Sequence, residues 1–235
     1  MVRGIVATRA RGRDLIERGR VLVDGRVVTK PAHLVSDHAD IGLAAETVVH
    51  VSRGAEKLIG GLAAFPFACR DRVALDVGAS TGGFTEVLLE RGARRVFAVD
   101  VGRGQLHARL RSDPRVTSLE ETDARLLSRD LLPEPITATV ADVSFISLAK
   151  ALPAALALAQ PGCWLIALIK PQFEVGPALV GKGGIVRDVA ARDRAVEAIH
   201  RWLSVEMGWR VAGVVPSPIT GGDGNHEFLI GATKP

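Results

Sequence analysis

The segment Leu75-Asp76-Val77-Gly78-Ala79-Ser80-Thr81-Gly82-Gly83-Phe84 decides the fold of this 235-residue chain. It joins an apolar strand, predicted over 72–77, through a glycine-rich turn to a helix, predicted over 82–91. Glycines let the backbone approach a ligand closely, because they carry no Cβ. The turn matches neither GxGxxG, which would indicate a dinucleotide, nor GxxxxGK[ST], which would indicate a nucleoside triphosphate. We therefore expect another kind of ligand here.

Strands and helices alternate along most of the remaining chain. The pattern predicts further strands over 95–100, 115–119, 137–143, 163–169, 209–215 and 227–232. It predicts helices over 52–65, 103–111, 147–159 and 188–207. This order predicts an α/β fold, a Rossmann-like sheet of seven mostly parallel strands with helices on both faces. Because no helix separates the last two strands, we expect them to form an antiparallel edge pair.

The composition favours a globular protein with an anionic partner. Hydrophobic residues make up 47% of the chain and the net charge is +4. Residues 1–30 hold eight basic side chains against three acidic ones, so the electropositive part is the beginning of the chain. The two cysteines, Cys69 and Cys163, form no CxxC pair. We therefore expect no metal site and a reducing, cytoplasmic location.

Two segments bear on domain organisation and on membranes. The basic helix predicted over 8–19 and a hairpin over 20–28 around Asp24-Gly25 form a small unit with 29–43. We expect this unit to span 1–43, a linker to span 44–51 and a second domain to span 52–235. The most apolar stretch, 151–169, has nearly the length of a membrane span, but Pro153 and Pro161-Gly162 interrupt it. No transmembrane segment is expected.

Two acidic residues follow strands next to the glycine-rich turn. Ligands of open α/β sheets bind at the carboxyl ends of the strands. Asp100 ends the second predicted strand, where it could accept hydrogen bonds from both hydroxyls of a ribose, and Asp123 follows the third, where it could accept an adenine amino group. These features predict an adenosine cofactor without phosphates, most commonly S-adenosylmethionine. The alternative is that the glycines only form a tight turn and the acids are solvated.

Four further polar residues are expected at the same edge of the sheet or beside it. Asp142 and Lys170 each end an apolar strand, Lys57 lies on the helix before the sheet, and Glu227 opens the last strand. A buried lysine is costly unless a carboxylate pairs with it, and two neighbouring lysines would lower each other's proton affinity. Lys170 could then act as a base toward a hydroxyl, with Asp142 orienting it and Lys57 and Glu227 positioning a ribose. The alternative is an ordinary surface salt-bridge cluster.

Several motifs together carry a family resemblance from about residue 8 to the end of the chain. They are VSRG with Lys57-Leu58, LDVGASTGGFT, AVDVGRGQL, ADVSFISL, IKPQFE, VGKGGIVRD, SPITG and GNHEFL. The chain resembles the TlyA-type (haemolysin A family) rRNA methyltransferases, which belong with the FtsJ-like ribose 2′-O-methyltransferases. The resemblance implies a Lys-Asp-Lys-Glu tetrad at Lys57, Asp142, Lys170 and Glu227. It also implies an S-adenosylmethionine loop at Asp76–Phe84 with adenosine contacts at Asp100 and Asp123, and methylation of cytidine ribose in 16S or 23S rRNA within ribosomal subunits.

The N-terminal unit is similar to the alpha-L RNA-binding motif. That similarity implies phosphate contacts from its arginines, Arg9, Arg11, Arg13, Arg18 and Arg20. Met1–Ala7 is too short to supply the usual first helix of the motif, which is therefore expected to be truncated. Where many relatives carry asparagine, this chain has Asp123. The loop Gly181–Asp188, with Lys182 and Arg187, either closes over RNA or cofactor or is a flexible connection.

Two other functions remain as alternatives. A non-catalytic, RNA-binding ribosome assembly factor could retain the same fold, although an intact tetrad argues against it. The family's older name suggests a pore-forming haemolysin, and the lack of a continuous apolar span argues against that. The sequence indicates no particular oligomeric state.

Overall fold

The computed structural model describes residues 4–6, 9–17, 19–44 and 50–235, without the side chains of Ala10, Arg11, Asp14 and Glu17. The chain divides into two compact units, Met1–His50 and Val51–Pro235. Most of the expected linker, 45–49, lies outside the described residues, as do parts of the segment expected to lack a first helix. The linker and the truncation therefore stay predictions.

In its described residues, the smaller unit contains one helix and a three-stranded antiparallel sheet. Helix α1 (Arg9–Glu17) precedes the strands β1 (Val21–Val23), β2 (Arg26–Val28) and β3 (Ile41–Leu43), which pair in the order β2-β1-β3. The predicted hairpin is confirmed: Asp24 and Gly25 have φ angles of 50° and 75°, the left-handed conformation that a two-residue turn requires. Leu15 of α1 is buried against this unit.

The larger unit is built on a seven-stranded sheet. Its elements are α2 (Gly54–Ala64), β4 (Val73–Val77), α3 (Gly83–Glu90), β5 (Arg95–Val99), α4 (Ala108–Arg111), β6 (Val116–Leu119), β7 (Ile136–Ala141), α5 (Leu148–Ala151), α6 (Pro153–Leu158), β8 (Ala159–Ile169), α7 (Pro171–Glu174), α8 (Val189–Arg201), β9 (Arg210–Pro216) and β10 (Phe228–Thr233). The strand order is β6-β5-β4-β7-β8-β10-β9. Only β10 runs antiparallel to its neighbours, so the predicted sheet and its antiparallel final pair are confirmed.

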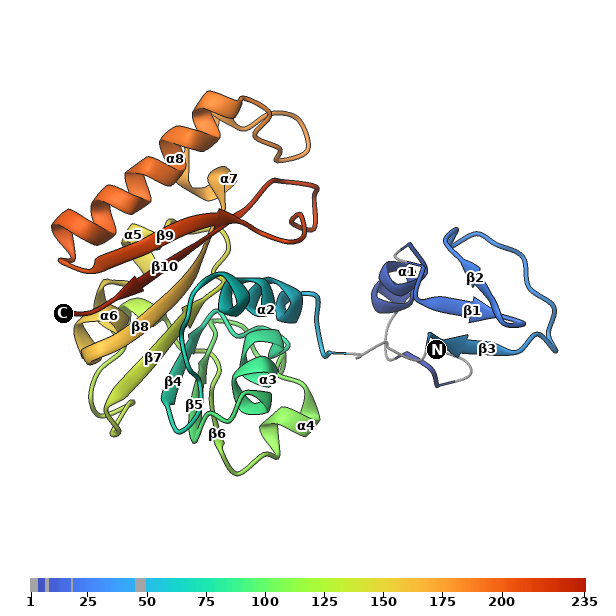
Figure 1. Cartoon of the computed structure of the whole chain (residues 1–235), viewed down its shortest axis with the longest axis horizontal. Helices are drawn as coiled ribbons and strands as arrows, with labels where there is room; N and C mark the ends of the chain where they lie inside the picture. Colours follow the sequence, from blue (N-terminus) through green and yellow to red (C-terminus); the bar gives the residue numbers. More distant parts are fainter. Residues whose placement is uncertain (1–3, 7–8, 18, 45–49) are drawn as a thin grey trace. The chain divides into compact units, whose positions relative to one another are not determined.

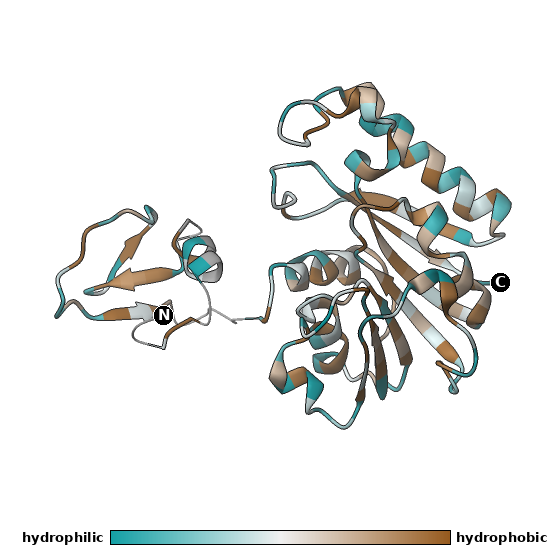
Figure 2. Cartoon of the chain, turned by 180° about the vertical axis from the view of Figure 1, so that it is seen from behind, coloured by the Kyte–Doolittle hydropathy of each residue, from teal (hydrophilic) through white to brown (hydrophobic). Residues whose placement is uncertain are grey.

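Helices cover both faces of the sheet (Figure 1). Alternate residues of the central strands enter two separate apolar clusters, because successive side chains of a strand point to opposite faces. Leu75 and Phe97 pack in one cluster with residues of α5, α6 and α8. Ala74 and Val96 pack in the other with residues of α2, α3 and α4. Figure 2 shows the result: the strands are mostly hydrophobic, whereas hydrophilic and hydrophobic residues alternate along the helices.

Three predicted elements differ in detail from the structure. The single helix expected over 147–159 is two helices, because Pro153 begins a new helix at its first position. The helix expected over 103–111 begins only at Ala108, since the residues before it form an irregular loop. Strand β8 begins at Ala159 rather than at 163, with a shift in its register to β7. None of the described helices is long and apolar enough to cross a membrane.

Candidate active site

The glycine-rich turn between β4 and α3 depends on glycine at two positions. Gly78 has a φ angle of 82°, and a Cβ there would lie 2.6 Å from the carbonyl oxygen of Asp142 at the end of β7. Gly82 has a φ angle of 98°, and a Cβ there would lie 2.3 Å from Leu110 of α4. At Gly78 a larger residue would therefore force the turn away from the backbone of Asp142, whereas at Gly82 it would displace leucine side chains and strain the left-handed backbone.

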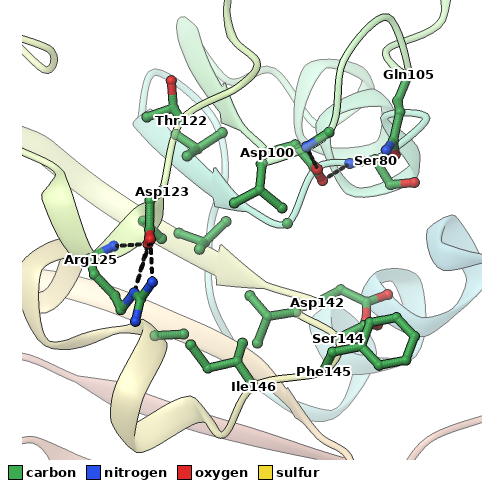
Figure 3. A pocket seen from close by; sticks show the side chains of 18 residues that line it. Ser80, Asp100, Gln105, Thr122, Asp123, Arg125, Asp142, Ser144, Phe145 and Ile146 are labelled. Carbon is green, nitrogen blue, oxygen red and sulfur yellow. Dashed lines mark hydrogen bonds and ion pairs between the residues drawn. The ribbon is translucent and has the colours of Figure 1, made fainter.

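Two adjoining cavities open at the carboxyl ends of the strands. The larger has a volume of about 560 Å³, and the smaller one has about 190 Å³. Both are lined by Gly78, Ser80, Asp142 and Ser144, so the two cavities meet at these residues. The polar side chains of the larger cavity are drawn in Figure 3. The larger cavity is also lined by Asp100, Gln105, Thr122, Asp123, Arg125 and Phe145, and the smaller by Ser52, Gly54, Ala79, Thr81, Gly83, Phe84 and Lys170.

Asp100 binds backbone amides on both sides of the larger cavity. Its Oδ2 accepts a hydrogen bond from Ser80 N at 2.8 Å, and its Oδ1 accepts one from Gly102 N at 2.7 Å (Figure 3). The carboxylate therefore ties the glycine-rich turn to the loop that follows β5. Each carboxylate oxygen has a second lone pair, so Asp100 retains the capacity to accept further hydrogen bonds from a ligand.

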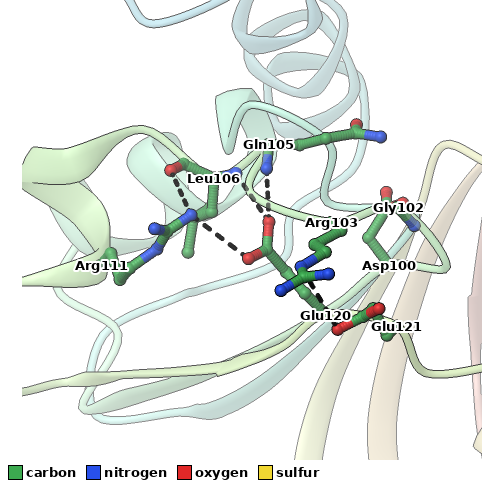
Figure 4. Close-up of polar contacts among 8 residues, drawn as sticks. All are labelled: Asp100, Gly102, Arg103, Gln105, Leu106, Arg111, Glu120 and Glu121. Atoms are coloured by element: carbon green, nitrogen blue, oxygen red, sulfur yellow. Dashed lines mark hydrogen bonds and ion pairs between the residues drawn. The ribbon is translucent and has the colours of Figure 1, made fainter.

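Glu120 shapes the same loop from the end of β6. Its Oε1 accepts hydrogen bonds from Gln105 N at 2.6 Å and Leu106 N at 3.0 Å, and its Oε2 lies 3.2 Å from Nη2 of Arg111 (Figure 4). These donors hold the pKa of the Glu120 carboxyl below its usual value, the amide of Leu106 contributing most. Glu120 thereby fixes the loop that places Gln105 at the wall of the cavity.

Asp123 lines the larger cavity but is already paired. The guanidinium of Arg125 binds both carboxylate oxygens, with distances of 2.6 to 3.0 Å, as Figure 3 shows. The side-chain hydrogen bonds from Arg125 lower the pKa of Asp123 to about 2. The carboxylate is therefore ionised at neutral pH and can only accept hydrogen bonds, which suits an amino group as its ligand.

The structure brings Lys57, Asp142, Lys170 and Glu227 together as one Lys-Asp-Lys-Glu cluster. Lys170 Nζ lies 2.7 Å from Asp142 Oδ1, and Lys57 Nζ lies 2.7 Å from Glu227 Oε2 and 3.7 Å from Asp142 Oδ2. The hydroxyl of Ser144 also contacts Lys170 Nζ, at 2.8 Å. Asp142 thus contacts both lysines, one with each carboxylate oxygen.

Burial argues against an ordinary surface salt-bridge cluster. Only 8% of Lys57, 8% of Lys170 and 4% of Glu227 is exposed to solvent. Lys57 lies on α2, Lys170 directly follows β8 and Glu227 directly precedes β10, whereas Asp142 follows β7. Burial of ionic groups costs free energy because they lose their contact with water. Ion pairs at a protein surface contribute too little stability to offset such a cost. Because Asp142 lines both cavities and Lys170 lines the smaller one, these two members of the cluster can reach a ligand.

Two predicted cofactor-binding residues of the glycine-rich motif, Asp76 and Gly82, line neither cavity. The carboxylate of Asp76 is fully buried, and Oδ2 accepts a hydrogen bond from Thr85 Oγ1 of α3 at 2.7 Å. Burial raises the pKa of Asp76 to about 7, despite the opposing hydrogen bond from Thr85. In this structure Asp76 therefore supports the turn from behind, between β4 and α3.

The raised pKa of Asp76 gives a prediction about stability and pH. The Asp76 carboxyl has its ordinary pKa of 3.8 in the unfolded chain, whereas its pKa in the folded protein is about 7. Protonation of Asp76 therefore stabilises the folded protein fully below pH 3.8, and this contribution is lost as the pH rises through about 7. Asp76→Asn, which cannot ionise, should remove this pH dependence. Denaturant unfolding at pH 5 and pH 8 should show a larger decrease for the wild type than for Asp76→Asn. Equal decreases would contradict the prediction.

The predicted RNA-binding residues are only partly described. Arg9, Arg13 and Arg20 have exposed side chains in the smaller unit. Arg18 lies outside the described residues, and the structure does not describe the side chain of Arg11. Lys182 and Arg187 are both exposed on the 181–188 loop. Every predicted residue of this set with a described side chain is therefore accessible to an anionic partner.

Sequence reasoning missed several residues at the site. Ser144, Gln105 and Arg125 line the larger cavity, and Glu120 positions the loop that contains Gln105. Phe145 also lines this cavity, is 91% exposed, and has a φ angle of 65°. Its ring packs 5.2 Å from that of Phe173. The signal for Ser144 and Phe145 was their position directly after Asp142, whereas nothing in the sequence indicated the contacts of Glu120.

Two family descriptions match this chain. The FtsJ-like methyltransferase family matches residues 50–234, which include all the cavity-lining residues and the Lys-Asp-Lys-Glu cluster. The S4 domain matches residues 2–41, the part in which the sequence predicted a small RNA-binding unit.

Curated relatives and solved structures resemble most of the chain. The 16S/23S rRNA (cytidine-2′-O)-methyltransferase TlyA of Mycobacterium tuberculosis is 47% identical over 97% of this chain and 85% of its own length. Hemolysin A of Brachyspira hyodysenteriae is 38% identical over 96% of this chain and 94% of its own length. A solved protein of Streptococcus thermophilus, also named a hemolysin, is 39% identical, with a TM-score of 0.79 over 98% of this chain and 84% of its own length.

Proposed function

Because the chain belongs to the FtsJ-like methyltransferase family, we propose that it transfers a methyl group from S-adenosylmethionine to a ribose 2′-hydroxyl of ribosomal RNA. The observation that carries this proposal is the buried Lys-Asp-Lys-Glu cluster, in which Asp142 lines both cavities and Lys170 lines the smaller one. We place the reaction in the cytoplasm, where bacterial ribosomal subunits are assembled.

The larger cavity fits an adenosine-containing cofactor. Gly78 lets the turn lie directly against the backbone of Asp142 at the wall of this cavity, since a Cβ there would clash with that backbone. Asp100 offers lone pairs for ribose hydroxyls, and Asp123 is held as an ionised acceptor for an adenine amino group. Gly78, Ala79, Ser80, Thr81, Gly83 and Phe84 would hold the methionine part, because they extend from the larger cavity into the smaller one.

The chemistry of methyl transfer to a hydroxyl needs a base. The cofactor supplies an electrophilic methyl group on a positively charged sulfur. The attacking hydroxyl must lose its proton, and Lys170 in its neutral form accepts that proton at Nζ. Asp142 and Ser144 orient Nζ, and the carboxylate of Asp142 stabilises the ammonium that forms. Lys57, held by Glu227, positions the ribose beside them.

The substrate class is proposed from the chain's two domains together. A domain of the S4 type with exposed Arg9, Arg13 and Arg20 suits an RNA backbone. The relative from M. tuberculosis is named for cytidine 2′-O-methylation of 16S and 23S rRNA. We therefore propose cytidine as the target nucleotide, in one or both ribosomal subunits.

The proposal is tested by methyl transfer to isolated ribosomal subunits. Tritiated S-adenosylmethionine is supplied with 30S and with 50S subunits that lack the modification, and the labelled RNA is digested to nucleosides. We expect label in 2′-O-methylcytidine. Label on a base, or rRNA binding without any transfer, would contradict the proposal, and the second result would favour an assembly factor.

The N-terminal arginines should contribute to RNA affinity through counterion release. Replacing Arg9 and Arg20 with alanine removes two exposed cations from the smaller unit. The slope of log affinity against log salt should then become less negative by about 0.7 to 0.9 for each phosphate that is no longer neutralised. Filter binding to rRNA between low and moderate salt measures this slope. Arg70→Ala, an exposed cation before β4, is the control and should leave the slope unchanged. Equal slopes for all three proteins would contradict RNA contact by Arg9 and Arg20.

A further inference from the structure

One buried side chain joins two loops beside the Lys-Asp-Lys-Glu cluster. Asn225 is 1% exposed and lies two positions before Glu227. Its Nδ2 donates a hydrogen bond to the carbonyl oxygen of Gly184 at 2.8 Å, and its Oδ1 accepts one from Val186 N at 3.0 Å. Both ends of the amide are therefore used, and both bind the backbone of the 181–188 loop, about forty residues away in sequence.

The 181–188 loop has few other backbone contacts of its own. Gly181 N donates to Ile185 O and Gly184 N donates to Gly181 O, each at 3.0 Å. Gly183 and Gly184 have φ angles of 78° and 76°, so the turn uses conformations that glycine reaches more easily than other residues. The buried amide of Val186 is satisfied by Asn225, and a buried backbone group without a partner would be costly. Asn225 therefore determines where this basic loop lies.

The same side chain belongs to the loop that leads into Glu227. Gly221 N donates to Asn225 O at 2.9 Å, and Ser217 N donates to Glu227 O at 2.9 Å, so the loop closes on itself. A Cβ at Gly221 would lie 2.5 Å from Oε1 of Glu227, which shows how closely this loop surrounds the carboxylate. Displacing Asn225 would therefore displace the backbone that aims Glu227 at Lys57.

We propose that Asn225 is a positioning residue that holds the 181–188 loop and Glu227 in one arrangement. Exposed Lys182 and Arg187 stand on that loop, so an RNA strand contacting them meets a surface fixed to the cluster that acts on the ribose. This inference rests on the proposed function for its effect on turnover. Its structural part, the joining of the two loops, concerns the free protein alone.

The test compares Asn225→Ala with Asn225→Asp and with His226→Ala, a control at the exposed neighbouring position. Asn225→Ala removes both hydrogen bonds, whereas Asn225→Asp keeps an acceptor for Val186 N and loses the donor to Gly184 O. Three quantities are measured for each variant: amide hydrogen exchange across 181–188, the dissociation constant for S-adenosylmethionine, and kcat and KM for rRNA methylation.

We expect Asn225→Ala to accelerate amide hydrogen exchange at Val186 and to lower kcat/KM for rRNA about tenfold or more. The reason is that the substitution leaves the buried partners of two hydrogen bonds unsatisfied. Cofactor affinity should stay within about twofold of wild type, because the cofactor cavity lies at other strands. Asn225→Asp should fall between Asn225→Ala and His226→Ala in both exchange and turnover.

Two results would overturn the inference. One is a methylation rate of Asn225→Ala equal to that of His226→Ala, whatever hydrogen exchange shows. The other is an equal loss of cofactor affinity and turnover in Asn225→Ala, which would indicate general damage to the protein. A wild-type protein that methylates no rRNA would overturn the proposed function instead. The exchange comparison in the free protein would then decide whether Asn225 joins the two loops.

Discussion

Replacing Lys170 with arginine is expected to lower kcat by about 100-fold to 10,000-fold, the usual contribution of a positioned base. Arginine keeps a positive charge beside Asp142, so the ion pair survives, but a guanidinium does not lose its proton in proteins and cannot accept another. Lys170→Ala should be equally inactive for the same chemical reason. Single-turnover methyl transfer to ribosomal subunits under saturating cofactor measures the chemical step directly.

The arginine variant separates a base from a structural cation. Lys170→Ala leaves Asp142 with only the more distant contact to Lys57, at 3.7 Å, so loss of activity in that variant alone could reflect local rearrangement. Lys150→Ala, an exposed lysine on α5, is the matched control and should retain full activity. If Lys170→Arg keeps more than about a tenth of the wild-type rate, Lys170 is not the base.

Replacing Gly78 with alanine is expected to have the largest effect on cofactor binding. The new Cβ would lie 2.6 Å from the carbonyl oxygen of Asp142 and 3.0 Å from its carbonyl carbon, and both belong to backbone that cannot rotate away. The φ angle of 82° adds the strain of a left-handed conformation. Strain and overpacking together should lower the free energy of unfolding by about 2 to 4 kcal/mol. The dissociation constant for S-adenosylmethionine should rise by at least about 100-fold, since the turn and Asp142 must both move.

Gly104→Ala is the control for the backbone strain alone. Gly104 has a φ angle of 65°, yet a Cβ there would meet nothing within 4 Å. This variant should lose only about 1 kcal/mol of unfolding free energy and should bind the cofactor almost as the wild type does. Calorimetric titration and denaturant unfolding measure both quantities. Equal cofactor affinities for Gly78→Ala and Gly104→Ala would show that contact with the backbone of Asp142 does not shape the site.

The strand pattern was sufficient to predict the sheet. Continuous apolar runs such as CWLIALI over 163–169 can be buried only with helices on both sides, and parallel strands need such helices to connect them. The antiparallel end of the sheet followed from the lack of a helix between β9 and β10. Some local features were less predictable: the late start of α4 accompanies the contacts of Glu120 with the loop before it, which no short segment contains. The interruption at Pro153 is a local effect of proline at the first position of α6.

The sequence by itself determined which polar groups lie together at one edge of the sheet. A lysine at the end of a buried strand and aspartates after neighbouring strands must share one edge of a parallel sheet, so Lys170, Asp142 and Asp100 were found from strand ends alone. Resemblance to a family supported Lys57 and Glu227 as members of the same site. Tertiary structure decided the rest, because hydrogen bonds and ion pairs between distant segments form only when the chain is folded. Through those contacts Asp142 binds two lysines, and Asp123 pairs with Arg125. They also bond Asp76 to Thr85, away from both cavities, and bond Asn225 to a second loop.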